Sequence, residues 1–493
     1  MRISGQVSGL GLPIGAILLT LGLSSIALGG QSTQIVPVPE KDRAEAIAIF
    51  KQLIEINTTD TPLGNVTTAS EAMRKRFLDA GFAPEDVHLL GPNERKQNLV
   101  VRMRGANSGA GSAKPVLFLC HVDVVEALPK DWHTNPFEFV EKDGYYYGRG
   151  TQDMKESDAA LVATFLRLHR EGYKPDRNLI LALTADEEGG SFNGAEWLVE
   201  KHRDLVDAAY VINPDSGGIE LNHGKPVVAA VEATEKVYAD YQVTATNPGG
   251  HSSLPRKDNA IYELTGALNK LAAYSFPFEL NGVTRAYFEA LAKQEPATTA
   301  ADMHAILATT PDMQAAARLS AEPGFNSNFR TTCVATRLSG GHANNALPQT
   351  AQANVNCRIF PGHSPEEIRH ELVKLFDDPK LAVKYVADTG VVSDTAPERK
   401  AIVPPPPVPE VFDPLRVLVN AIWPGTPVTP IMENGASDSI YFAQAGIPSY
   451  GFSAIALERD DVRAHGQDER LPVDSYTKSL EFFYSYLKAV SSK

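Results

Sequence analysis

The 493-residue chain has only three cysteines, too few for a disulfide scaffold in a chain of this length. It also lacks an excess of basic residues: 46 Lys and Arg against 60 Asp and Glu give a net charge of −14. Without a basic surface, nucleic acid is not an expected partner. We find no internal repeat, which argues against a repeat architecture. The composition, with 43% hydrophobic and 22% charged residues, is that of a soluble folded protein.

Charge is absent from the N-terminus between Arg2 and Glu40. The apolar stretch 14–23 and the small residues Ala27 and Gly29 are typical of a signal peptide with its cleavage site, so we assign residues 1–30 to export into a periplasm or out of the cell. The alternative is an uncleaved membrane anchor formed by the same segment, although its Gly and Ser content makes it weakly apolar. No cysteine follows the stretch, so a lipid-anchored N-terminus is not indicated.

The remaining length exceeds one typical domain, and its first part has an α/β pattern. Segment 41–80 has helical periodicity and is followed by strongly apolar runs at 115–120, 178–183 and 209–212. A helical pattern at 159–168 separates the first two runs. Runs that are apolar on both faces, separated by helices, predict buried strands of a mostly parallel sheet. We assign 31–231 to the first part of the larger α/β domain.

The pattern changes at residue 232. The segment 232–390 predicts strand, helix, two strands, helix and strand, and this βαββαβ order is that of a small α+β domain inserted into the larger one. Its second helix begins at Ser364 with a capping box and Pro at the first position. The stretch 276–324 is an unusually long insertion without a sequence explanation. After four consecutive prolines, α/β character returns in 391–493 as the second part of the larger domain.

The three apolar runs lead directly into acidic or imidazole side chains. In an open parallel sheet, ligands bind beyond the carboxyl ends of the strands, so these side chains are predicted to converge. The residues at the three ends are His121 and Asp123, then Glu187 and Glu188, then Asp215.

Taken alone, each of these features has an ordinary structural explanation. A polar strand end explains His121 and Asp123, and a solvated acidic loop explains the adjacent Glu187 and Glu188. Asp153 stands at a predicted helix start, where it can serve as an N-cap. Taken together, these carboxylates and imidazoles suit Zn²⁺ or a similar divalent ion. There are more acids than one ion needs, which favours a two-metal site.

Five motifs, in order over nearly the whole mature chain, resemble those of one family. It is the dinuclear zinc hydrolase family of aminoacylase, carboxypeptidase G, carnosinase, and the acetylornithine and succinyl-diaminopimelate deacylases. The motifs are His121-Val122-Asp123-Val124-Val125, Gly148-Arg149-Gly150 with Asp153-Met154-Lys155, Asp186-Glu187-Glu188-Gly189-Gly190, Gly250-His251-Ser252-Ser253 and His465-Gly466-Gln467-Asp468-Glu469-Arg470.

The resemblance implies two zinc ions, for which Co²⁺ or Mn²⁺ can substitute. Asp153 would bridge them. His121 and Asp215 would complete the binding of one ion, and Glu188 and His465 that of the other.

The resemblance also implies the roles of two further acids. Glu187 would be the general base that activates a water between the ions and later protonates the leaving amine. Asp123 would hold His121. The peptide bond between Asp153 and Met154 would be cis.

The resemblance identifies the inserted domain, 232–390, as a lid or dimerisation domain and the larger domain as catalytic. In the lid, it implies three substrate-binding residues. His251 would stabilise the oxyanion, in dimeric relatives from the opposite subunit, which makes a homodimer through the lid a further expectation. Asn345 and Arg358 would clamp a substrate carboxylate. Alternation along the strand supports Arg358, because it lies opposite the apolar face of its neighbours. A structural salt bridge is the alternative for Arg358.

The three cysteines are not expected to do chemistry. Cys120 lies within a buried strand and is expected in the core. Cys333 and Cys357 lie in neighbouring predicted strands, where an exported protein could bridge them. We favour two reduced cysteines.

The function expected from these residues is hydrolysis, by a zinc-dependent metallopeptidase, of an amide bond next to a free carboxylate in dipeptides or short peptides. Asp215, where some relatives carry Glu, favours the peptidase branches. The alternative is an aminoacylase-like amidohydrolase acting on N-acyl amino acids. A metal-free binding or scaffold protein would have lost a ligand or the base, yet every such position is filled.

Overall fold

The computed structural model describes residues 35–107, 112–387, 389–397 and 402–492. The predicted signal peptide, residues 1–30, lies outside the described residues. Within the described ranges, no helix is both long enough and apolar enough to cross a membrane.

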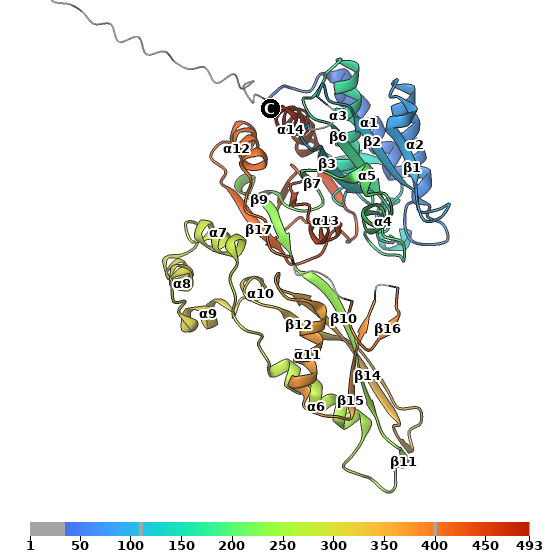
Figure 1. The fold of residues 1–493 in the computed structure, drawn as a ribbon, viewed down its shortest axis with the longest axis vertical. Coiled ribbons are helices and arrows are strands. Elements are labelled where there is room, and N and C mark those ends of the chain that lie inside the picture. Colours follow the sequence, from blue (N-terminus) through green and yellow to red (C-terminus); the bar gives the residue numbers. More distant parts are fainter. Residues whose placement is uncertain (1–34, 108–111, 388, 398–401, 493) are drawn as a thin grey trace, which may run out of the picture. The chain divides into compact units, whose positions relative to one another are not determined.

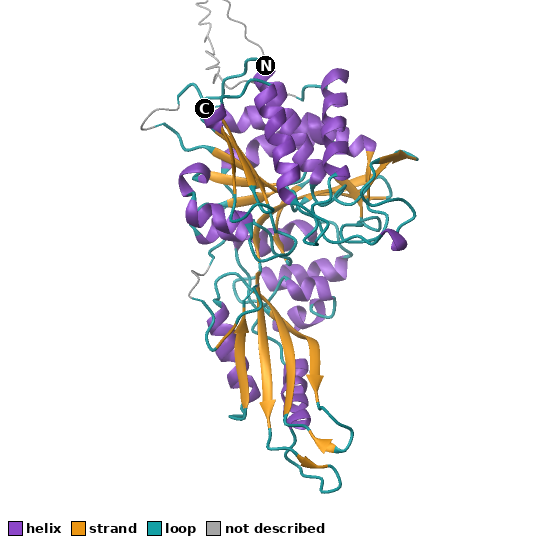
Figure 2. Ribbon diagram, turned by 90° about the vertical axis from the view of Figure 1, so that its right-hand side faces the viewer, coloured by secondary structure: helices purple, strands orange, loops and turns teal. Residues whose placement is uncertain are grey.

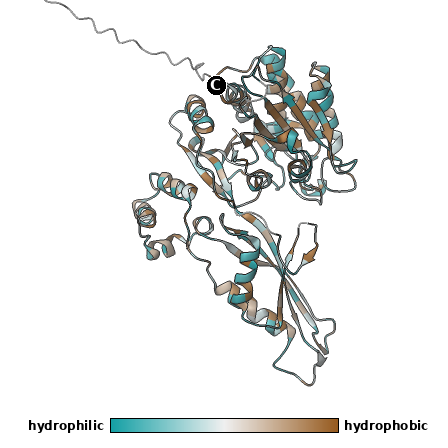
Figure 3. Cartoon of the chain, in the orientation of Figure 1, coloured by the Kyte–Doolittle hydropathy of each residue, from teal (hydrophilic) through white to brown (hydrophobic). Residues whose placement is uncertain are grey.

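The larger part of the fold is built on a ten-stranded mixed sheet whose centre is parallel (Figure 1). Strands β6, β3, β7 and β18 are parallel neighbours in this order. Helices cover the sheet, so β3 and β6 are buried along their whole length, and Figure 3 shows these central strands as hydrophobic. The strands are β1 (Val87–Leu90), β2 (Asn98–Met103), β3 (Val116–His121), β6 (Leu179–Thr184), β7 (Tyr210–Asn213), β8 (Gly218–Asn222), β9 (Lys225–Glu235), β17 (Val428–Glu433), β18 (Ser449–Gly451) and β19 (Ala456–Glu458).

The helices of this part contribute much of its core. The predicted helical stretch 41–80 is two helices, because residues 56–65 form a loop between α1 and α2. This part also contains a small sheet of β4 (Val140–Lys142), β5 (Tyr145–Tyr147) and β20 (Arg470–Pro472). In the sequence, β4 and β5 precede α3, and β20 precedes α14. The helices are α1 (Glu40–Glu55), α2 (Val66–Asp79), α3 (Lys155–Arg170), α4 (Gly194–Lys201), α5 (Arg203–Val206), α12 (Pro409–Ile422), α13 (Ser439–Gln444) and α14 (Val473–Ser491), with short 3₁₀ turns at Pro84–Asp86 and Pro129–Asp131.

The predicted βαββαβ lid is confirmed as β10-α6-β12-β14-α11-β15, and Figure 2 shows its antiparallel strands side by side. Its sheet has the order β12-β14-β10-β15-β16, and α6 and α11 pack on it and on each other. The predicted capping box at Ser364 is present. The elements are β10 (Val237–Thr246), α6 (Ala260–Ala273), β12 (Thr332–Gly340), β14 (Thr350–Ile359), α11 (Pro365–Phe376), β15 (Leu381–Val386) and β16 (Val392–Ser393), with a two-stranded ribbon of β11 (Gly250–His251) and β13 (Ala346–Leu347).

The insertion that the sequence left unexplained is a group of four helices with a small core of its own around Phe288, Met303 and Phe329. Val283 at its start belongs to the core of the larger part, and α7 contacts β17. The insertion is therefore attached to both parts. Its helices are α7 (Gly282–Leu291), α8 (Ala297–Leu307), α9 (Met313–Leu319) and α10 (Pro323–Ser327).

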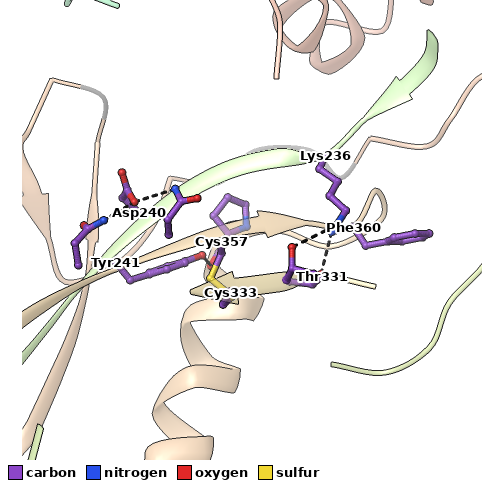
Figure 4. Close-up of a disulfide and its surroundings, with 11 residues drawn as sticks. Lys236, Asp240, Tyr241, Thr331, Cys333, Cys357 and Phe360 are labelled. Carbon is purple, nitrogen blue, oxygen red and sulfur yellow. Dashed lines mark hydrogen bonds between the residues drawn. A yellow bond between two sulfur atoms is a disulfide. The ribbon is translucent and has the colours of Figure 1, made fainter. Parts of the chain in front are cut away.

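A disulfide joins Cys333 of β12 to Cys357 of β14 (Figure 4). The two cysteines are direct partners in the antiparallel register, which brings their Cα atoms to 4.1 Å. The prediction of two reduced cysteines is therefore wrong, because periodicity does not reveal the strand register. Cys120 is free and buried, as predicted.

Candidate metal centre

The candidate site lies at the carboxyl ends of β6, β3 and β7, which are neighbours in the sheet. His121 ends β3, Glu187 and Glu188 follow β6, and Asp215 follows β7. Asp153 comes from the loop before α3, and His465 from the loop between β19 and β20. The predicted ligands are thus brought together from five distant stretches of the chain.

The first half of the cluster surrounds His121, which is almost fully buried. Its Nε2 atom lies 3.2 Å from Oδ1 of Asp215 and 3.2 Å from Oδ1 of Asp153. The carboxylate of Glu187 is 4.0 Å away. Nδ1 faces the main-chain oxygen of Asp123 at 3.1 Å. In the tautomer that donates from Nδ1, Nε2 is free to bind a cation.

The second half surrounds His465. Its Nε2 atom lies 3.1 Å from Oδ2 of Asp153 and 2.9 Å from Oε2 of Glu188. Asp153 therefore faces both imidazoles, one with each carboxylate oxygen. This is the geometry expected of a bridging carboxylate between two ion sites.

Asp123 orients the site in a way that the sequence did not reveal. Its carboxylate is 3.7 Å from Nδ1 of His121, whereas its main-chain oxygen is the closer partner. The carboxylate instead accepts the backbone N–H groups of Glu187, at 3.2 Å, and Glu188, at 3.0 Å. Asp123 thus fixes both His121 and the turn that carries the two glutamates.

Glu469 holds the loop that carries Asp153. Its fully buried carboxylate accepts the backbone N–H groups of Gly150, Gln152 and Asp153 at 3.1, 2.6 and 3.2 Å. Arg149 donates to the same carboxylate at 2.5 Å. The peptide bond after Asp153 is cis, as the resemblance implied. A buried acid facing four donors cannot be predicted from the motif alone, since Glu in a loop is usually solvated.

Two further residues near the site were also missed. Asp438 lies close to the glutamates, and its buried carboxylate accepts from Thr184 and Asn193, both at 2.7 Å. Lys155 is fully buried and donates to the main-chain oxygens of Leu53 and Ile56, both at 2.9 Å, which ties the start of α3 to the end of α1. No periodic signal marks either residue.

The crowding of acids perturbs the pKa values of the cluster. Hydrogen bonds to Asp153 and Glu188 raise the pKa of His465 to about 10. Burial alone would lower the pKa of His121, but the facing carboxylates, Asp215 above all, raise it well above its usual value. Burial, with Asp215 nearby, raises the pKa of Glu187 well above normal. In the metal-free protein, protons on the imidazoles compensate the acids.

The residues fit divalent cations. Two groups of three potential ligands have their donor atoms within 4.8 Å of one another: His121 with Glu187 and Asp215, and His121 with Asp153 and Glu188. Oδ1 of Asp153 is buried and has no hydrogen bond. Imidazole nitrogen and carboxylate oxygen are donors that Zn²⁺ accepts.

Two cavities adjoin the cluster. The arginine cavity, about 430 Å³, contains Arg358 and Asp438 together with Glu187, Glu188 and His465. The apolar cavity, about 390 Å³, reaches Asp153 and Asp215, and its remaining wall is mainly aliphatic: Ile219, Ala230, Ile431, Ile455, Leu457, Val462 and Ala464.

Of the three predicted substrate-binding residues of the lid, only Arg358 lines a cavity at the cluster. Its guanidinium lies 4.7 Å from the centre of the Tyr238 ring, and no acidic side chain among the described residues forms an ion pair with it. The structural salt bridge considered for Arg358 is therefore not found there. His251 and Asn345 lie together at the β11–β13 ribbon, where the main-chain oxygen of Asn345 accepts from Ser252. Within one chain they line neither cavity.

Comparison with known proteins agrees with this geometry. The model of peptidase family M20/M25/M40 matches residues 117–489. N-fatty-acyl-amino acid synthase/hydrolase PM20D1 of Xenopus tropicalis is 29% identical over 76% of this chain and 72% of its own length. Probable carboxypeptidase S-like 2 of Dictyostelium discoideum is 28% identical over 79% and 74%. The M20 family metallo-carboxypeptidase Sso-CP2 of Sulfolobus solfataricus has the same fold, with a TM-score of 0.65 at 15% identity over 91% of this chain and 99% of its own.

We predict that metal loading releases protons. With its pKa near 10, the His465 imidazole is protonated at neutral pH in the metal-free protein and must lose that proton to bind a metal, so apparent affinity rises with pH between about 7 and 10. Titration calorimetry with Zn²⁺ in buffers of different ionisation enthalpy should give at least about one proton released at pH 7.

His465→Ala should weaken metal binding and reduce the number of protons released, since only His121 then carries an imidazole proton in the cluster. His133→Ala, at an exposed histidine outside the cluster, should change neither. Heats independent of the buffer in the wild type would contradict the assignment.

Proposed function

Because this chain belongs to peptidase family M20/M25/M40, a family of metal-dependent hydrolases, we propose that its cluster cleaves an amide bond next to a free carboxylate. The substrate is a short peptide or an N-acyl amino acid. The observation that supports this most is Arg358, a cation without a described acidic partner in the cavity that Glu187, Glu188 and His465 also line.

Arg358 would select the carboxylate. A planar guanidinium can donate two parallel hydrogen bonds to one carboxylate, and stacking on Tyr238 fixes its plane. A substrate held in this way places its amide bond towards the cluster. Val237, Tyr238, Ile440 and Tyr441 add apolar wall for the side chain of the terminal residue.

Glu187 would transfer the proton. It lies between the arginine cavity and His121, and Asp123 fixes its main chain. Glu187 can take a proton from water as the oxygen bonds to the carbonyl carbon, and give it to the amide nitrogen as the C–N bond breaks. Two divalent ions held by His121, Asp153, Glu188, Asp215 and His465 would supply Lewis acidity that lowers the pKa of water and stabilises negative charge. We propose Zn²⁺ because of its preference for these donors.

Two variants test this function. Glu187→Gln should keep the bound metal and lower kcat at least about 10²-fold, since the amide cannot accept the proton. Arg358→Ala should lower kcat/KM at least about tenfold for N-acetyl-phenylalanine or leucyl-phenylalanine, and much less for their C-terminal amides. Metal content by mass spectrometry and initial rates are the readouts.

The matched control is Arg416→Ala, at a half-exposed arginine of α12 that lines neither cavity. It should leave both substrate classes unchanged. Equal losses of Arg358→Ala on acids and amides would reject the carboxylate clamp, and full activity of metal-loaded Glu187→Gln would reject the base.

We also propose a homodimer through the lid. β12 is the edge strand of the lid sheet, and Val334 and Leu338 on it are 59% and 65% exposed. Ile261 and Tyr262 of α6, which contacts β12, are exposed as well. An apolar edge strand of this kind fits a second copy of itself. A partner's lid is then the source from which His251 and Asn345 could reach the cluster.

Val334→Asp with Leu338→Asp should convert the dimer to a monomer in light scattering and lower activity, because the interface would bury two charges from each copy. Val373→Asp, at a 45% exposed position of α11, is the control and should remain dimeric. A wild type that is monomeric and fully active would contradict the proposal.

We propose export for the N-terminal segment. The Cys333–Cys357 disulfide supports it, since such bonds persist in oxidising compartments. In a bacterial host, the full chain should fractionate into the periplasm with loss of about 30 N-terminal residues, and a chain beginning at residue 31 should stay in the cytoplasm. Retention of the uncleaved full chain in membranes would favour the anchor instead.

A further inference from the structure

The two cavities border different predicted ligands of the cluster. The arginine cavity touches Glu188 and His465, whereas the apolar cavity touches Asp153 and Asp215. An amide carbon at the cluster would therefore have its amino-acid side in the first and its acyl side in the second. This assignment rests on the proposed function.

We propose that the apolar cavity binds the acyl group of the substrate and selects a neutral, apolar one over the free α-ammonium of a peptide. Its volume of about 390 Å³ is more than twice the roughly 150 Å³ that suffices for benzene, so an aryl or medium-length alkyl chain fits. Ile219 and Ile455 are buried in its wall, and Ile431 and Leu457 are half-buried beside it.

The polar groups of this wall are already paired. The side-chain amide of Gln152 donates to the main-chain oxygens of Asp461 and Arg470 and accepts from the N–H groups of Arg463 and Ala464. These four bonds use both N–H donors and both acceptor positions of the Gln152 side-chain amide.

The other polar groups are paired as well. Ser453 donates to the main-chain oxygen of Gly217 at 3.1 Å. Glu220 forms an ion pair with Arg459. Among the described lining residues, only the cluster acids Asp153 and Asp215 remain, and these face the imidazoles. An α-ammonium entering this cavity would lose its water and find no carboxylate free to pair with it. Its transfer into the cavity would therefore cost free energy.

The inserted helices give the cavity its outer support. α7 packs on β17, the strand that contributes Ile431 to the wall, and its Val283 is in the same core as β17. Tyr287 of α7 is close enough to Glu220 and Arg459 for their charges to affect its pKa, which burial raises to about 12. The insertion thus supports the strand at the cavity's rim.

A matched pair of substrates tests the proposal. Hexanoyl-phenylalanine and norleucyl-phenylalanine differ only by the α-ammonium. With the zinc-loaded full-length enzyme, kcat/KM should be at least about tenfold higher for the hexanoyl compound. From acetyl to hexanoyl it should rise by up to about fourfold per methylene.

Ile431→Phe and Leu457→Phe should each fill the cavity and lower the hexanoyl-to-acetyl ratio at least about tenfold. Because both rates are measured on the same variant, the ratio does not depend on the amount of active enzyme. As a control, Val373→Phe on the exposed face of α11 should retain the wild-type ratio. Circular dichroism identifies a variant that fails to fold. The proposal is then tested with the other phenylalanine variant alone.

Equal or faster cleavage of norleucyl-phenylalanine would overturn the acyl pocket while leaving the hydrolase intact. Unchanged ratios in the folded fillers would overturn it in the same way. If neither compound were cleaved by the zinc-loaded enzyme, the proposed function would fail and the pocket proposal with it.

Discussion

The structure depends on compensating negative charge in a very small volume. Oxygen atoms of Asp153 and Asp215 lie 3.2 Å from one imidazole nitrogen, and those of Asp153 and Glu188 about as close to a second. Carboxylates at such distances repel one another strongly unless positive charge lies between them. Protonated imidazoles can provide this positive charge. A cation beside a neutral imidazole provides it as well, and it also gives a partner to the unprotonated ring nitrogen and to Oδ1 of Asp153, which has no hydrogen bond.

The surrounding fold holds these groups in place. The sheet places three strand ends side by side, and buried polar residues fix the loops that no strand supports. The carboxylate of Asp123 accepts hydrogen bonds from the backbone of Glu187 and Glu188, and that of Glu469 accepts from the loop before α3. Lys155 joins the start of α3 to α1 by a hydrogen bond. Removing one of these partners would leave a buried polar group unpaired, which is why buried polar residues are needed around the candidate cation ligands as well as among them.

Much of this could be predicted from the sequence. Apolar runs on both faces predict parallel strands, and parallel strands bring their carboxyl ends to one edge, so His121, Glu187, Glu188 and Asp215 could be grouped before any coordinates. The lid's element order could also be predicted from alternation and a capping box. Strand register, which pairs Cys333 with Cys357, and buried acids such as Glu469 could not, since both depend on contacts between distant segments. The apolar cavity was equally inaccessible, because it forms only when β8, β17 and β19 meet the cluster.

The division of the site between a cationic cavity and an apolar one suits a substrate with a carboxylate at one end and a hydrocarbon group at the other. That reading depends on two cations at the cluster. The most direct measurement is anomalous X-ray scattering at the zinc edge from crystals grown with zinc. We expect two peaks that share Asp153, one with His121 and Asp215 and the other with Glu188 and His465. No peak at these side chains in zinc-saturated crystals would contradict the account.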